Sequence, residues 1–192
     1  MIFNCKKTVC MHILPKWLKN FNVPNMYLNG AQLTWVHEQK YLGIIMTSTF
    51  TDNKDIIRQV RATYARGNAL ICKFRKCTDN VKVQLFKSFC SNFYCSSLWF
   101  NFTNATFNRL KVAYNNVFRS LMNISRRSSI SAAFVNFGVN CFNTLIRKCI
   151  TSLRQRVLCS DNVLIMSCLS CKFNSYISNM SKQWNSLILW FF

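Results

Sequence analysis

The stretch MYLNGAQLTWVHEQKYLGIIMT, residues 26–47, decides the predicted fold of the first part of the chain. Asn29 and Gly30 stand between two apolar runs, and both residue types tolerate the positive φ angles of a type I′ turn. The polar residues 37–40 predict a further turn, and residues 41–47 predict a third strand. We therefore expect residues 1–50 to form a short antiparallel β-meander.

The periodicity changes after residue 51, because apolar side chains then recur at steps of three or four. This spacing predicts an amphipathic helix over residues 53–76. Thr51 and Asp52 supply oxygens for its N-cap, and Asp55 places a negative charge at the positive end of the helix dipole. The predicted inner face consists of Ile56, Val60, Tyr64, Gly67, Ile71 and Phe74.

Further helical patterns follow this helix. Residues 79–99 are apolar on most sides, which is typical of a helix at the centre of a bundle. The other predicted helices span residues 106–124 and 141–157, with a weaker one at 164–169 and a loop at 125–129. Aromatic residues at helical spacing predict core positions for Phe86, Phe89, Phe93, Trp99 and Phe118.

These elements predict an α+β fold that is mostly α, with the β-meander followed by a helical bundle. The organisation that we expect is a strand-rich region at 1–50, a helical region at 51–158 and a poorly defined segment at 159–192.

The composition points to a polyanionic partner. The chain carries 25 Lys and Arg against 5 Asp and Glu, a formal net charge of +20. Its hydrophobic fraction of 51% is too high for a disordered chain. Self-repulsion at this charge weakens a compact state unless a polyanion relieves it, and nucleic acid is the commonest such partner, followed by an anionic membrane surface.

Neither a membrane span nor a disulfide framework is expected. The uncharged residues 88–108 are rich in Ser, Asn and Thr, and the apolar residues 187–192 are too few to cross a bilayer. No signal peptide precedes the 11 cysteines, so we expect reduced thiols and a cytoplasmic or nuclear location. Cys168 and Cys171 have metal-knuckle spacing without a second knuckle, so zinc binding stays open.

The motif KYLGII at residues 40–45, followed by a basic amphipathic helix, is the most informative element of the chain. Residues 26–47 followed by residues 55–68 resemble non-LTR retrotransposon reverse transcriptases. In that family an "NG…KYLG" element follows the catalytic strands of the palm and begins the thumb. Residues 1–3 match the strand that comes after the catalytic Asp-Asp turn.

The resemblance implies that Tyr41, Leu42 and Gly43 form a primer grip and that the helices from Ile56 onward form a thumb. The expected partner is a primer–template duplex of RNA or DNA, held without sequence readout. The expected phosphate contacts are Arg58, Arg61, Arg66 and Lys73. Replacing any one of these three arginines with Ala should lower the salt slope of binding by about one.

The resemblance also implies that the chain lacks the catalytic part of the enzyme. The whole family enzyme uses Mg²⁺ ions held by a set of aspartates. The acids of this chain are Glu38, Asp52, Asp55, Asp79 and Asp161, and no two are adjacent. We therefore expect no catalysis by the chain alone, no cofactor in it, and the polymerase aspartates upstream of Met1.

Two other interpretations remain open. The first is a basic helical module that binds acidic protein or anionic lipid, with Trp190, Phe191 and Phe192 as its apolar end. The second is the non-functional product of a decayed element. Among the aromatic residues, Tyr41 and Tyr64 are the best candidates for stacking on bases, because both are amphipathic and close to basic residues.

Overall fold

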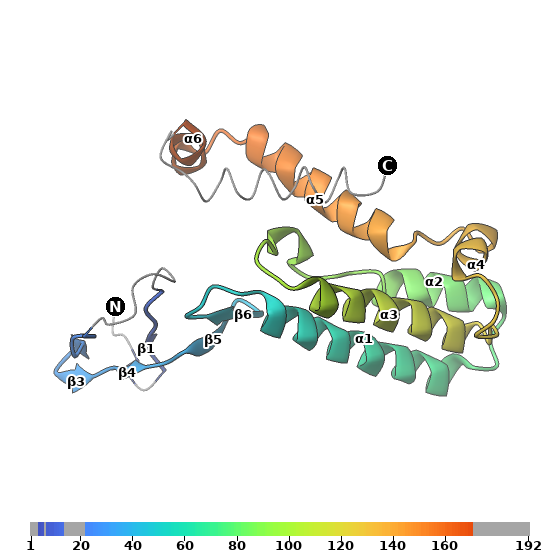
Figure 1. Ribbon diagram of the computed structural model, residues 1–192, viewed down its shortest axis with the longest axis horizontal. Coiled ribbons are helices and arrows are strands. Elements are labelled where there is room, and N and C mark those ends of the chain that lie inside the picture. Colours follow the sequence, from blue (N-terminus) through green and yellow to red (C-terminus); the bar gives the residue numbers. More distant parts are fainter. Residues whose placement is uncertain (1–3, 6, 14–21, 171–192) are drawn as a thin grey trace.

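The computed structural model describes residues 4–5, 7–13 and 22–170, with only the backbone described for 168–170. Short strands come first and helices follow (Figure 1), so the α+β, mostly α class that the sequence predicts is confirmed. Residues 1–3, Cys171 and residues 190–192, on which some of the expectations above rest, lie outside the described residues.

The described strands form three separate two-stranded pairings, so the prediction of one antiparallel meander is wrong. One pairing is parallel and two are antiparallel. The parallel pair is β1 (Val9–Cys10) with β4 (Thr34–Trp35), and the antiparallel pairs are β2 (Tyr27–Leu28) with β3 (Ala31–Gln32) and β5 (Glu38–Tyr41) with β6 (Ile44–Thr47).

The predicted Asn29-Gly30 hairpin is present, because φ is 51° at Asn29 and 78° at Gly30 between β2 and β3. The second turn of the predicted meander lies further along the chain than the polar pattern indicated. Residues 38–40, expected to be a turn, belong to β5, and the chain instead turns at Leu42 and Gly43, where φ is 46° and 84°. The apolar run of residues 41–47 hid this turn, because Leu rarely adopts a positive φ.

Two long helices, α1 (Asn53–Phe74) and α3 (Asn104–Leu121), lie side by side (Figure 1). Both agree with the predicted spans to within three residues. Gly67 of α1 allows the close approach, because a Cβ atom there would lie 2.4 Å from Val117 Cγ1. Tyr64, expected on the inner face of α1, is instead 38% exposed.

The second helix is shorter and more peripheral than predicted. α2 (Asp79–Phe89) ends ten residues before Trp99, and a short 3₁₀ turn, η1 (Ser96–Leu98), follows it. Cys95 has a positive φ of 59°, which interrupts the helical backbone between them. Val81 and Phe89 are exposed, so α2 does not occupy the centre, and the core prediction for Phe89 is wrong.

The remaining helices complete the bundle. α5 (Phe142–Leu158) and α6 (Val163–Ser170) agree closely with the predictions, whereas α4 (Ile130–Asn136) was not predicted. The core is largely aromatic: the ring centroids of Phe86 and Phe118 lie 4.9 Å apart, and those of Phe118 and Phe134 lie 4.8 Å apart. Within the described part of the chain, none of the helices is both long and apolar enough to cross a membrane.

Candidate nucleic-acid interface

The tip of the β5–β6 hairpin is an exposed apolar projection held from behind. Tyr41 is 61% exposed and Leu42 is 72% exposed. The Tyr94 hydroxyl donates a hydrogen bond to the Leu42 carbonyl at 2.9 Å. A Cβ atom on Gly43 would lie 3.1 Å from the Tyr94 ring, so glycine provides both the positive φ and the room for that ring.

Tyr94 is itself fixed to α1. The Gln59 side chain of α1 donates a hydrogen bond from Nε2 to the Tyr94 carbonyl at 3.1 Å. Arg66, two turns further along α1, donates from Nη1 to the Asn92 carbonyl at 3.4 Å. The loop that follows α2 therefore links the hairpin tip to the helix that carries the predicted basic contacts.

Asp55 joins three elements below this loop, and it is fully buried. Its Oδ1 accepts hydrogen bonds from the Ile45 amide at 3.1 Å and from Arg58 Nε at 2.7 Å. Its Oδ2 accepts a hydrogen bond from Trp99 Nε1 at 2.9 Å. Asp55 does lie in the first turn of α1, as predicted, but its carboxylate also ties the hairpin to the segment that follows η1.

Asp52 does not cap α1 with its side chain, in contrast to the prediction. Its Oδ2 instead accepts hydrogen bonds from the amides of Phe100 and Asn101, both at 2.8 Å. Burial raises the pKa of Asp52 above its ordinary value, although these two hydrogen bonds act in the opposite direction. Both aspartates at the start of α1 therefore hold residues that are more than forty positions away in the sequence.

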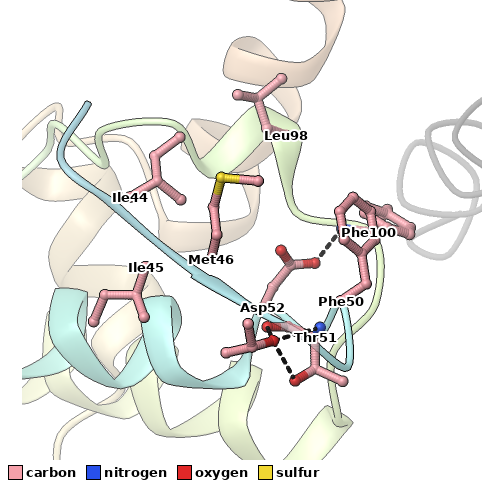
Figure 2. Close-up of a pocket in the computed structure, with 9 residues that line it drawn as sticks. Ile44, Ile45, Met46, Phe50, Thr51, Asp52, Leu98 and Phe100 are labelled. Atoms are coloured by element: carbon pink, nitrogen blue, oxygen red, sulfur yellow. Dashed lines mark hydrogen bonds between the residues drawn. The ribbon is translucent and has the colours of Figure 1, made fainter. Parts of the chain in front are cut away.

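A cavity of about 270 Å³ lies beside Asp52, between β6 and the chain around Leu98, and Figure 2 shows the side chains that line it. Its lining is mostly apolar, and among the described residues in it only Asp52 is ionisable. The described residues that line it are Ile44, Ile45, Met46, Thr47, Phe50, Thr51, Asp52, Leu98 and Phe100. The cavity can accept an apolar group, and none of the described residues that line it is a Lys, Arg or His that could bind phosphate.

The four predicted phosphate contacts on α1 differ in their exposure and in their bonds within the protein. Arg61 and Lys73 are exposed. Arg58 is half-buried in the ion pair with Asp55, and half-buried Arg66 bonds the carbonyls of Ala62 and Asn92.

These four residues do not form one compact cluster. Arg58 and Lys73 are separated by about 22 Å along the helix axis. They are spread along α1, with Arg58 and Arg66 on the side that contacts the residue 92–94 loop.

No match to this chain was found among known protein families, curated proteins or solved structures. The interface is therefore defined by its own geometry and charge. Among the described residues, no group of three or more His, Cys, Asp or Glu side chains could hold a metal ion. Cys171 and the side chain of Cys168, which have the metal-knuckle spacing, lie outside the described part of the chain.

Sequence reasoning did not identify Tyr94 or Trp99 as parts of this interface. Both lay inside the helix predicted for residues 79–99, where they were assigned to its apolar surface. Trp99 is indeed buried, but its indole N–H serves Asp55, and Tyr94 is exposed beside the hairpin tip. No local pattern could reveal these contacts, because their partners lie 44 and 52 positions away in the sequence.

Proposed function

We propose that this chain holds a nucleic-acid duplex, with the β5–β6 hairpin tip against the end of one strand and α1 along the phosphate backbone. This is the role that the resemblance to a reverse transcriptase assigns to a primer grip and thumb. The observation that carries the proposal is the linkage of an exposed hairpin tip to a basic helix through Asp55 and Tyr94.

The charges near α1 favour phosphate. Glu38, Asp55 and Asp79 are each paired with a base, namely Lys54, Arg58 and Lys82. Arg61 and Lys73 remain exposed on the same helix, together with Lys76 just beyond its end. Because polyanion binding releases counterions from each neutralised phosphate, affinity should fall steeply as salt increases.

The side chains of α1 between the basic residues are short. Ala65 and Ala69 are exposed, and Ala62 is half-buried beside Arg66. Short side chains allow a bulky partner to approach the helix closely, while the longer arginine and lysine side chains reach out on either side. A sugar–phosphate backbone fits this combination, because it requires cations at intervals and not a deep pocket.

The decisive experiment measures binding of the purified chain to a primer–template duplex over a salt series, with a primer-extension assay in parallel. We expect steep salt dependence and no extension by the chain alone. Arg61→Ala and Lys73→Ala should each lower the slope by about one on duplex DNA. Arg58→Ala and Arg66→Ala are less specific tests, because each also removes contacts within the protein.

Arg154→Ala is the matched control, since it removes one exposed positive charge from α5. We expect its slope to equal that of the unmodified chain. Equal effects of Arg61→Ala and Arg154→Ala would show that binding is spread over the whole surface and would contradict the proposed site. Absence of binding at low salt would refute the function, and primer extension would refute the expectation that the chain alone has no catalytic activity.

A further inference from the structure

A groove of about 410 Å³ lies between α1 and α3. Its floor and walls combine apolar side chains with one aromatic ring and one cation. The residues that line it are Val60, Tyr64, Ala105, Asn108, Arg109 and Val112. Its volume falls within the range of roughly 300–1,000 Å³ that is usual for small-ligand pockets.

Tyr64 gives the groove a flat aromatic wall. Its side chain is 38% exposed, and Asn116 Nδ2 lies 3.5 Å from its hydroxyl, which orients the phenol toward α3. Val112, across the groove on α3, is 51% exposed. Two exposed apolar surfaces that face a common hollow leave room for a flat apolar group between them.

The rim of the groove is cationic. Arg109 lines it from α3 and is exposed. None of the described residues that line the groove is a carboxylate. A flat ring joined to a negative charge matches these features, whereas a neutral apolar ligand leaves Arg109 unused and a bare anion leaves the ring unused.

We propose that this groove binds one unpaired base of a single-stranded nucleic acid, with the base against Tyr64 and its phosphate near Arg109. The inference rests on the proposed function and extends it from the duplex to its single-stranded continuation. Aromatic rings accept every base by stacking, so the groove would hold a base without reading the sequence. Asn108 at the rim can donate or accept a hydrogen bond toward the ring edge.

The test compares a short fluorescent oligothymidylate with an abasic oligomer that has the same sugar–phosphate backbone. Stacking of one base on an aromatic side chain changes affinity by roughly five- to 150-fold. We expect Tyr64→Ala to weaken oligothymidylate binding by at least about fivefold and to leave its salt slope unchanged. Tyr64→Phe should retain affinity to within about twofold, because the ring remains. Arg109→Ala should instead lower the slope by about 0.7.

Two controls separate stacking from misfolding. Tyr27→Ala removes a tyrosine that is 62% exposed on β2, and it should not affect binding. Tyr64→Leu keeps an apolar side chain against α3 but lacks an aromatic face, so it should weaken binding as Tyr64→Ala does while circular dichroism shows an unchanged helical fold. Equal weakening by Tyr64→Ala for the abasic oligomer, or no weakening for either oligomer, would overturn the proposal.

The outcomes also distinguish the two proposals. Duplex binding with the expected effect of Arg61→Ala, together with no effect of Tyr64→Ala on the oligothymidylate, would refute the base-binding groove alone. Failure of the unmodified chain to bind either the duplex or the oligothymidylate at low salt would refute both.

Discussion

Asp55→Asn should destabilise the fold far more than its position in the first turn of a helix would suggest. The carboxylate is fully buried and accepts three hydrogen bonds, from Ile45 N, Arg58 Nε and Trp99 Nε1. An asparagine has the same shape but keeps only one oxygen, and its amide group brings a new donor to the other position. At least one buried donor then faces another donor.

The magnitude follows from these contacts. Leaving a buried donor without an acceptor costs about 1–3 kcal/mol, and breaking a buried ion pair from one side costs about 3–5 kcal/mol. The Arg58 side chain is 26% exposed and can turn toward water, so the lower end applies to the ion pair. We expect the free energy of unfolding to fall by about 3 kcal/mol, a large part of the total stability of a domain.

Urea unfolding followed by far-UV circular dichroism measures this loss. Trp99→Phe alone should cost about 1–2 kcal/mol, because the other two donors still serve the carboxylate. The double variant should cost less than the sum of the two single variants, since removal of the indole N–H also removes the donor–donor conflict. In Asp55→Asn, hydrogen exchange at the Ile45 amide should be accelerated under conditions in which the protein as a whole is still folded.

Asp79→Asn is the matched control, because Asp79 also lies in the first turn of a helix but is exposed and lies 3.4 Å from Lys82. An exposed ion pair contributes less than about 1 kcal/mol. A loss below 1 kcal/mol for Asp55→Asn, or additive effects in the Asp55–Trp99 cycle, would refute the view that this carboxylate links the hairpin to the bundle.

Three further predictions concern packing, pH and the hairpin tip. Gly67→Ala should lower the free energy of unfolding by about 1–3 kcal/mol despite the higher helix propensity of Ala, because the new Cβ would lie 2.4 Å from Val117 Cγ1. Thermal unfolding should show that a second substitution, Val117→Ala, restores part of this loss. Because the pKa of Asp52 is raised in the folded state, the folded protein loses stability as the pH rises from the ordinary pKa of 3.8 through the raised pKa. Urea titrations at stepped pH should therefore show that Asp52→Asn gains stability relative to the unmodified chain over that range. A decrease in its relative stability would contradict the burial effect. Tyr94→Phe removes the hydrogen bond to the Leu42 carbonyl and should weaken duplex binding while the salt slope stays the same; a change in slope would show that Tyr94 acts through charge.

The helices could be predicted because their apolar residues repeat at helical spacing over long segments. The predicted spans for α3 and α5 begin and end within three residues of those observed. Where a helix is apolar on most sides, the pattern loses its power to locate an end. α2 ends at Phe89 although apolar residues continue to Trp99, and the backbone adopts a positive φ at Cys95 before η1 begins.

The strands were harder to predict, since each is only two to four residues long. The Asn29-Gly30 turn was visible because both residue types favour a positive φ. The turn at Leu42 was not, because leucine has no such preference and its conformation is stabilised by a contact with Tyr94. A tertiary contact selected this turn against the local preference.

The candidate site also has a part that could be predicted from the sequence and a part that could not. The basic residues of α1 could be named from the sequence, because a surplus of cations on an amphipathic helix is a local pattern. The arrangement of the site around these basic residues could not be predicted, because it depends on two polar side chains, Asp55 and Gln59, that are buried although they lie outside the helix face predicted to be apolar. A buried polar residue is evident only when its partners are known.

The exposed tip and the buried carboxylate therefore form one structural unit. A two-stranded hairpin is marginally stable alone, so the orientation of Tyr41 and Leu42 depends on Asp55 and Trp99 behind them. If the tip grips a nucleic-acid strand, a loosened tip must pay an ordering cost on binding, which lowers affinity without changing the number of phosphates contacted. Trp99→Phe should then weaken duplex binding with an unchanged salt slope, although Trp99 is buried and touches no ligand. Binding that is indifferent to this substitution would separate the hairpin from the function, and would leave α1 alone as the nucleic-acid surface.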